Sequence, residues 1–295
     1  MERGKMIDIH THIGYRSAKD KAVCDERELL RQMDALGIKQ AVLLPLGASP
    51  ECSFFWYGNE AVIQLAKRYP DRFIAFCDID PRNVKNSPDS DFMWILEEYK
   101  EAGCKGVGEM TANLYIDDPL CMNLLRQCGK AGMPVIYHCA EAVRHGLYGM
   151  ADDIGLPRLE KVLWALRETT IMGHAMSFWS EISADVDPKT RGGYPKGRVK
   201  PGGRLPELLR KYPNLCGDLS AGSGFNAISR DPEFGYRFLE EFQDKLLLGT
   251  DICHVNQKVE IVPYLKKALA DGKISQMAYN KIVRENAIRL LGLKG

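Results

Sequence analysis

Two histidines near the amino terminus have the spacing of a metal-binding pair. The segment Met6-Ile7-Asp8-Ile9-His10-Thr11-His12 alternates apolar and polar residues with period two, which predicts a β-strand. Residues two apart on a strand point to the same side, so His10 and His12 can direct both imidazoles at one point. Two converging neutral imidazoles are a common start to a zinc, iron or manganese site. The alternative is an ordinary pair of strand-end histidines.

Further residues of metal-ligand type follow predicted strands along the rest of the chain. Four of them end a predicted strand, and these are Glu109, His138, His174 and Asp251. The two remaining histidines, His145 and His254, fall in the loops after two of these strands. Histidines without a shared role would be scattered over helices and over both ends of a domain. Imidazole and carboxylate groups suit zinc, manganese or iron(II), so the pattern favours a metal site.

The elements that must position these residues are strands alternating with helices along the whole chain. Hydrophobic periodicity predicts strands at 6–12, 40–44, 72–78, 105–109, 134–138, 170–174, 215–219 and 246–251. It predicts helices at 25–36, 59–69, 92–102, 119–131, 158–168, 205–212, 232–242, 259–270 and 276–291. Strand–helix alternation requires a parallel sheet, and eight strands favour a closed (β/α)8 barrel over an open doubly wound sheet.

We therefore expect one α/β domain over residues 1–295, a distorted (β/α)8 TIM barrel with long loops at the carboxyl-terminal face and an extra C-terminal helix. In this fold, active sites lie at the carboxyl ends of the strands. All candidate ligands lie at that end, which strengthens the prediction of a metal site.

Composition limits the classes of protein. A formal net charge of +1, without blocks of like charge, gives little reason to expect nucleic acid or a membrane surface as a partner. The sequence shows no signal-peptide segment and no apolar run that could span a bilayer. Nine cysteines without a Cys-x-x-Cys pair predict a reduced, cytoplasmic protein. We expect a small-molecule substrate, and a homodimer is compatible with the sequence.

In combination, these motifs resemble the metal-dependent amidohydrolase superfamily. The similarity rests on Ile7-Asp8-Ile9-His10-Thr11-His12, Gly108-Glu109, Tyr137-His138, Gly173-His174 and Gly249-Thr250-Asp251. Residues 213–220 and 286–292 are similar to its amidohydrolase-2 branch, which includes aminocarboxymuconate-semialdehyde decarboxylase and related lactonases and hydrolases.

The resemblance implies a set of metal ligands. In that branch the first two histidines, the strand-five histidine and the strand-eight aspartate usually hold one divalent metal, and the strand-six histidine helps to activate water. These roles would fall on His10, His12, His138, Asp251 and His174. Zinc is the favoured ion, with manganese or iron(II) as alternatives, at one or two ions per chain.

Strand four departs from this branch. The segment Val107-Gly108-Glu109-Met110 is more similar to TatD-type deoxyribonucleases, in which the glutamate bridges two metals. The alternative is that Glu109 only orders a neighbouring histidine or lysine. The number of metal ions therefore stays open.

The expected chemistry is hydrolysis of a C–O or C–N bond in a lactone, ester or amide that carries an anionic group. Asp251 would act as the general base, and His174 would position water or serve as a second-site ligand. Decarboxylation of a carboxylated aromatic or unsaturated acid is one alternative. Cleavage of phosphodiesters by a TatD-like nuclease is another.

Substrate recognition is expected in the loops beyond the strand ends. The segment 175–203 is long, basic and rich in glycine, which predicts a lid over the metal. The candidate substrate-binding residues are Arg144, His145, Arg191, Arg198, His254 and Trp56. A solvated basic loop or a subunit contact is the alternative for the arginines, and a packed loop or a dimer interface is the alternative for Trp56.

Overall fold

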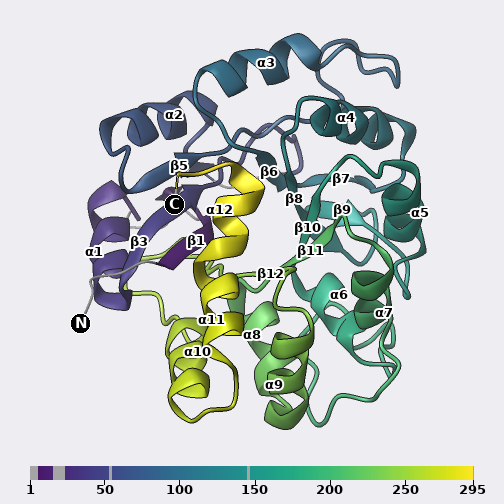
Figure 1. Ribbon diagram of the computed structural model, residues 1–295. Coiled ribbons are helices and arrows are strands. Elements are labelled where there is room, and N and C mark those ends of the chain that lie inside the picture. The colour runs from purple at the N-terminus through teal and green to yellow at the C-terminus, as the bar shows by residue number, and fades with distance from the viewer. Residues whose placement is uncertain (1–5, 16–23, 53–54, 145–146, 295) are drawn as a thin grey trace.

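The structure, a computed structural model, describes residues 6–15, 24–52, 55–144 and 147–294. Parallel strands form its centre, and helices surround them (Figure 1). In chain order the central strands are β1 (Met6–Thr11), β3 (Ile38–Leu43), β5 (Phe73–Ala75), β6 (Val107–Met110), β8 (Val135–Ala140), β10 (Ile171–His174), β11 (Leu215–Asp218) and β12 (Leu246–Leu247). Each overlaps a predicted strand, so the predicted parallel α/β architecture is confirmed.

Backbone contacts join these strands into a ring. β1, β3 and β5 pair in that order, and a second sheet contains β6, β8, β10, β11 and β12. A bridge between Cys77 and Val107 connects the two sheets at one junction. At the other junction, the Ile9 N–H donates to the Leu248 carbonyl at 2.9 Å. The strands therefore follow one another around a barrel in chain order, with regular pairing interrupted at the two junctions.

The outer helices bury one face each against the strands. They are α1 (Glu26–Leu36), α2 (Asn59–Arg68), α3 (Met93–Glu101), α4 (Pro119–Lys130), α5 (Pro157–Ala165), α7 (Arg204–Lys211), α9 (Pro232–Glu241) and α10 (Ile261–Ala270). In α1, the Asp25 side chain accepts the Glu28 N–H at the start, and Gly37 ends the helix with a φ of 80°. Its Leu29 and Met33 are buried. Among the described helices, none has the length and apolar character needed to cross a membrane.

Short elements lie in segments that the sequence predicted as loops. They are β2 (Gly14–Tyr15), β4 (Phe55–Trp56), β7 (Ala112–Tyr115), β9 (Gly149–Ala151), α6 (Met176–Trp179), η1 (Ser180–Ile182) and α8 (Ala221–Ser229). Except for α8, which has nine residues, these elements have two to four residues and carry too little periodicity to be recognised. The predicted long loop 175–203 begins with two short helical turns, since α6 and η1 are buried against the barrel, and residues 183–203 contain no helix or strand.

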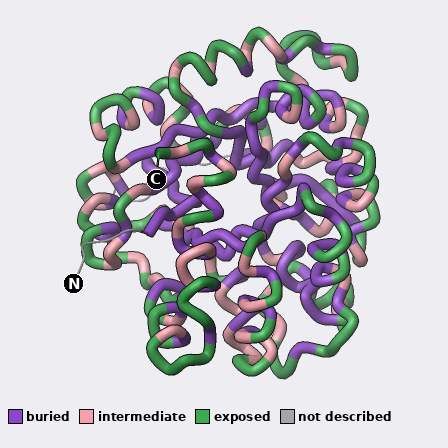
Figure 2. Tube along the Cα trace, viewed as in Figure 1, coloured by how far each residue is buried: buried purple, intermediate pink, exposed green. Residues whose placement is uncertain are grey.

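The barrel interior is a packed core that is closed at the amino-terminal end of the strands. Side chains from β1, β3, β8, β10 and β12 fill it, together with Ala287 and Leu291 of α12 (Asn286–Leu291). The predicted last helix is interrupted, because a π-helical turn η2 (Lys281–Glu285) separates α11 (Gln276–Asn280) from α12. Figure 2 shows burial concentrated in the central strands. The functional groups must therefore lie at the opposite, carboxyl-terminal end.

Candidate metal centre

The imidazoles of His10 and His12 meet at the end of β1. Their Nε2 atoms lie 3.1 Å apart. His10 Nδ1 donates to Asp218 Oδ2 at 2.6 Å, and His12 Nδ1 donates to the Leu44 carbonyl at 2.9 Å. With both protons on Nδ1, the two Nε2 lone pairs face each other. A cation between them removes this repulsion, so the donor pair fits a metal ion.

Two carboxylates complete a first group of donors. Glu109 Oε2 lies 3.7 Å from His10 Nε2 and 3.5 Å from His12 Nε2. Asp251 Oδ1 lies 3.7 Å and 3.6 Å from the same two atoms. Ligand atoms at these separations can surround a cation with bonds of about 2.0–2.2 Å.

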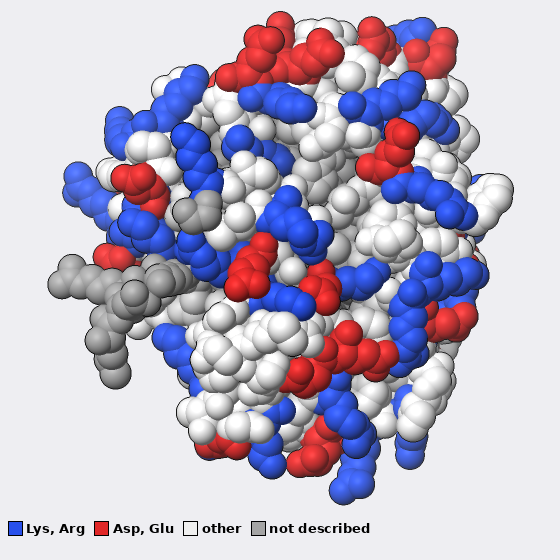
Figure 3. All heavy atoms as spheres, in the orientation of Figure 1, with Lys and Arg blue, Asp and Glu red and all other residues white. Residues whose placement is uncertain are grey.

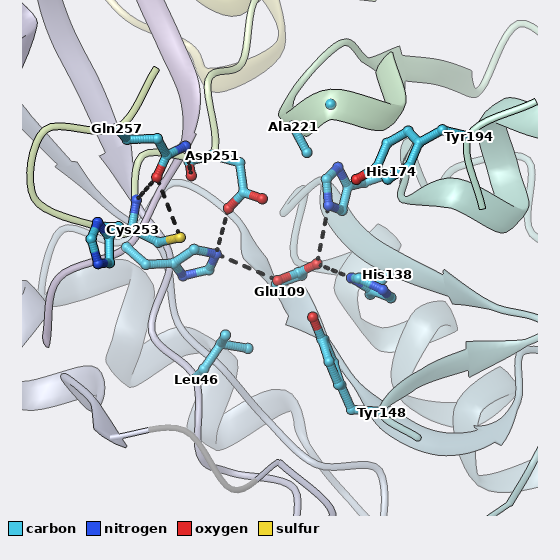
Figure 4. Close-up of a pocket in the computed structure, with 13 residues that line it drawn as sticks. Leu46, Glu109, His138, Tyr148, His174, Tyr194, Ala221, Asp251, Cys253 and Gln257 are labelled. Atoms are coloured by element: carbon cyan, nitrogen blue, oxygen red, sulfur yellow. Dashed lines mark hydrogen bonds and ion pairs between the residues drawn. The ribbon is translucent and has the colours of Figure 1, made fainter. Parts of the chain in front are cut away.

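Glu109 also belongs to a second group. Its other oxygen, Oε1, lies 2.8 Å from His138 Nδ1 and 3.7 Å from His174 Nε2. Figure 4 shows the carboxylate between Asp251 on one side and the two histidines on the other. The structure thus brings together all six residues that the sequence predicts as metal ligands. Glu109 faces His10 and His12 with one oxygen and His138 and His174 with the other.

Burial and charge set the protonation of these groups. Burial, with the neighbouring His10, lowers the pKa of His12 to about 4, and burial likewise lowers the pKa of His174 to about 3. Burial alone would raise the pKa of Glu109, but His138 and His10 hold it well below its usual range. Burial raises the pKa of Asp251 to about 6. Burial alone would lower the pKa of His10, but Asp218 raises it to about 10, so a metal ion that binds at His10 must displace a proton. Neutral imidazoles and ionised carboxylates are the forms that bind a divalent metal.

Asp218 and Ser220 form an outer pair that the sequence analysis missed. Asp218 Oδ2 accepts from His10 and lies 3.6 Å from His174 Nδ1. Ser220 Oγ lies 2.7 Å from His174 Nδ1, and the Ser220 N–H donates to Asp218 Oδ1. The Asp218 carboxylate packs directly against Gly249, where only glycine fits, because a Cβ at that position would lie 2.3 Å from Asp218 Oδ1. The signal was available, since Asp218 falls within a predicted strand-end segment like the other ligands.

A cavity of about 450 Å³ is lined by five of the six candidate ligands, namely His12, Glu109, His138, His174 and Asp251. Its lining beyond the candidate ligands consists of Leu46, Tyr148, Tyr194, Ala221, Gly222, Cys253, His254 and Gln257. Neither Tyr148 nor Tyr194 was a predicted site residue. A cavity of this size accommodates a small molecule.

Only some of the predicted substrate-binding residues lie at the cavity. His254 lines the cavity. Arg191 does not: it is only 2% exposed, its Nε lies 3.1 Å from Glu181 Oε1, and its Nη1 donates to the Asp152 carbonyl. The structure therefore corrects its predicted position at the mouth of the site. A buried guanidinium needs such partners, and they hold it inside the protein.

Of the other predicted contacts, Arg144 and Arg198 are not among the described residues that line the cavity. Arg144 is exposed and pairs with Glu141 at 2.5 Å, and Arg198 is exposed. His145 lies outside the described residues, and for Trp56 only its backbone, in β4, is described.

Two protein families match separate parts of the chain. The TatD related DNase family matches residues 7–158, and the Amidohydrolase family matches residues 192–293. The first match includes Glu109, and the second includes Asp218 and Asp251. Among curated proteins, none matches the chain.

Solved structures with the same fold span the whole chain. An uncharacterised TIM-barrel protein from Bordetella bronchiseptica has a TM-score of 0.69 at 18% identity and covers 97% of this chain and 98% of that chain. A protein from Pseudomonas putida named as a 2-pyrone-4,6-dicarboxylic acid hydrolase has a TM-score of 0.62 at 16% identity, covering 97% of each chain. A 5-carboxyvanillate decarboxylase from Novosphingobium aromaticivorans, a mutant with bound manganese, has a TM-score of 0.58 at 14% identity and covers 98% of each chain.

These likenesses establish the TIM-barrel fold. The TatD related DNase match covers just over half of the 295 residues, and the Amidohydrolase match covers most of the carboxyl-terminal part. The chain therefore belongs to the TatD related DNase family, whose model matches more than half of it, and its carboxyl-terminal part matches the Amidohydrolase family, in agreement with the predicted resemblance.

Proposed function

We propose that this protein is a metal-dependent hydrolase that cleaves a C–O or C–N bond in a small lactone, ester or amide. The observation that carries the proposal is the position of Glu109, which lines the cavity and directs one oxygen to each of two donor groups. Imidazole and carboxylate donors at the carboxyl end of a barrel are suited to activating water.

Each residue has a distinct part in this chemistry. A divalent cation bound here would lower the pKa of coordinated water from about 15.7 to near 7. Asp251, whose pKa burial raises to about 6, is the proton acceptor, since a base that titrates near neutral pH accepts and releases protons readily. His174, held through Nδ1 by Ser220, positions the substrate or the second cation with Nε2. The donor set suits zinc, with manganese or iron(II) as alternatives.

We infer a two-ion arrangement from the geometry. His10, His12 and Asp251 would hold one ion, His138 and His174 the other, and Glu109 would bridge both. Each predicted ligand is then used once, and Glu109 is shared.

Two other reactions have specific support. Decarboxylation of a carboxylated aromatic or unsaturated acid is supported by the decarboxylase of the same fold. Phosphodiester cleavage is supported by the TatD related DNase match. We favour a small-molecule substrate over nucleic acid, because the formal net charge of the chain is only +1. Figure 3 shows the face on which α12 lies, opposite the cavity, and acidic and basic side chains are interspersed on it. A homodimer is compatible with this function.

Metal analysis and a substrate panel test the proposal. We expect two zinc or manganese ions per chain in the wild type, and weaker binding with loss of one ion in Glu109→Gln, because a neutral amide bridges poorly. Glu160→Gln, at a surface pair with Arg204, is the control and should bind both ions.

The metal-loaded protein is then assayed with lactones, esters, amides, carboxylated aromatics and phosphodiesters. Hydrolysis of the first three classes supports the proposal. Carbon dioxide release or phosphodiester cleavage alone would replace it with one of the two alternatives, and a protein that binds no metal would refute all three.

A further inference from the structure

Tyr148 lines the cavity but has no role in the proposed function so far. It lines the cavity beside Glu109 and His138, and Figure 4 shows its hydroxyl pointing toward the Glu109 carboxylate. Asp251 lies on the other side of Glu109 in the same view. A substrate group above the two donor groups would thus have the proposed base on one side and a phenol on the other.

The backbone fixes Tyr148 in this place. Its ring centroid lies 4.5 Å from that of His138, with the planes tilted by 44°. The next residue, Gly149, has a φ of 119° and begins β9, which pairs with β8 through Met150 and Cys139. A Cβ on Gly149 would lie 2.9 Å from both His138 Cδ2 and the His138 carbonyl oxygen. Only glycine permits this approach, and the approach brings the preceding tyrosine onto the His138 ring.

The hydroxyl stays a donor over the working pH range. A tyrosine phenol has an ordinary pKa of about 10, so it carries its proton at neutral pH and can donate a hydrogen bond. A neutral donor in a mostly buried position is the kind of group that stabilises developing negative charge.

We propose that Tyr148 is a catalytic residue, whose hydroxyl donates a hydrogen bond to the substrate oxygen that becomes negatively charged when water adds to the carbonyl carbon. This proposal rests on the proposed hydrolase function. In the addition step, the water oxygen forms a bond to the carbonyl carbon, a proton passes from the water to Asp251, and the C=O π pair moves onto the oxygen. Tyr148 keeps its proton and stabilises that oxygen.

The alternative is that Tyr148 only supports the His138 ring, and two substitutions separate the two roles. Tyr148→Phe keeps the ring on His138 and removes the hydroxyl, whereas Tyr148→Leu removes both. Loss of one oxyanion donor typically lowers kcat by about 10²–10³-fold. We therefore expect Tyr148→Phe to lower kcat to that extent with little change in KM and with wild-type metal content. Tyr115→Phe, at the surface tyrosine stacked on Arg158, is the matched control and should resemble the wild type.

A binding measurement keeps the test independent of turnover. Inorganic phosphate, a tetrahedral oxyanion, is titrated calorimetrically into the zinc-loaded wild type and both variants. A hydrogen bond to a charged oxygen predicts at least about tenfold weaker phosphate binding in Tyr148→Phe.

The outcomes distinguish this inference from the function on which it rests. A wild type that hydrolyses no lactone, ester or amide refutes the proposed function, and the phosphate titration still decides whether Tyr148 donates to an oxyanion. A wild type that hydrolyses these substrates, with Tyr148→Phe unchanged in both kcat and phosphate affinity, refutes the role of Tyr148. If Tyr148→Leu loses metal while Tyr148→Phe keeps wild-type kcat and phosphate affinity, the ring only supports His138 and the hydroxyl has no catalytic role.

Discussion

At the scale of single residues, the carboxylates of this protein differ because their surroundings differ. Burial raises the pKa of Asp251, whereas His138 and His10 lower that of Glu109 against the same effect of burial. One is thereby suited to accept protons and the other to remain an anionic ligand. The pKa values of the two carboxylates differ because Glu109 lies closer to the imidazoles that lower its pKa.

Asp251→Asn should lower turnover by roughly 10²–10⁴-fold, the usual loss for a general base. The amide keeps the shape and one oxygen ligand but cannot accept the proton. Steady-state kinetics with metal content measured in parallel checks this. Near-normal turnover with both ions bound would show that another group accepts the proton.

Asp218 and Ser220 should control metal affinity from outside the donor groups. Substituting such a hydrogen-bonding partner typically weakens metal binding by about 10–100-fold. Asp218→Asn should weaken the ion held by His10, while Ser220→Ala should affect chiefly the ion near His174. Calorimetric titration of the apo-protein resolves the two steps. Equal effects of both substitutions on both ions would contradict the separate assignments.

Asp152 should make stability depend on pH away from the metal centre. Burial raises its pKa to about 6, although the Leu159, Arg158 and Asp153 N–H groups donate to it. The folded protein then holds a proton that the unfolded chain releases near pH 4, so this group's contribution to the free energy of unfolding falls as pH rises from about 4 to about 6.

Asp152→Asn lacks this titration. The stability of the wild type minus that of the variant should therefore fall by about 1–3 kcal/mol across that window in urea titrations. Asp117→Asn is the control with the opposite sign: burial alone would raise the pKa of Asp117, but Lys161 and Arg158 lower it, so there the wild type loses stability relative to the variant as pH falls. A flat difference for Asp152→Asn would contradict the raised pKa.

At the scale of elements, residues 175–203 are partly core and partly surface. The α6 and η1 turns are buried, and Arg191 ties the following chain to Glu181 and Asp152. Three residues farther on, Tyr194 is 54% exposed and lines the cavity. The part that could serve as the predicted lid is residues 184–202, which are exposed or half-buried apart from Arg191 and Val199.

Limited trypsin digestion should reflect this division. Cleavage is expected after Lys189, Lys196 or Arg198, which are exposed, and not after Arg191, whose side chain is buried. Phosphate with zinc should slow the cuts nearest Tyr194. Mass spectrometry of early fragments is the measurement, and early cleavage after Arg191 would show that the anchor does not hold in solution.

At the scale of the whole molecule, the candidate metal centre lies where the first barrel strand, β1, meets the last, β12. His10 and His12 come from β1, and Asp251 follows β12, the last strand. Asp8 strengthens the same junction, since its Oδ2 accepts from Thr250 Oγ1 at 2.5 Å. A cation bound across this junction stabilises the closed ring relative to the unfolded chain.

Removing the metal should therefore lower Tm. Free metal at a hundredfold excess over Kd stabilises by about 2.7 kcal/mol, which in a protein of this size corresponds to a Tm shift of roughly 5 °C. Scanning fluorimetry with chelator and with added zinc measures it, and Glu109→Gln should show a smaller shift. An identical Tm in both conditions would argue against a cation at the junction.

The sequence alone determined the strand–helix alternation and the residues that converge at the metal centre. Both follow from local information: periodicity defines each strand, and parallel topology places all carboxyl ends at one edge, so His10, Glu109, His174 and Asp251 had to meet. Asp218 lay within reach of the same reasoning.

Only the tertiary structure decided what surrounds that centre. Arg191 has the residue type and loop position of a substrate anchor, yet Glu181 and Asp152 bury it. Tyr148 and Tyr194 carry no sequence signal, yet both line the cavity. The conformation of a long loop is set by contacts with residues far away in the chain, and those contacts leave no periodic pattern in the sequence.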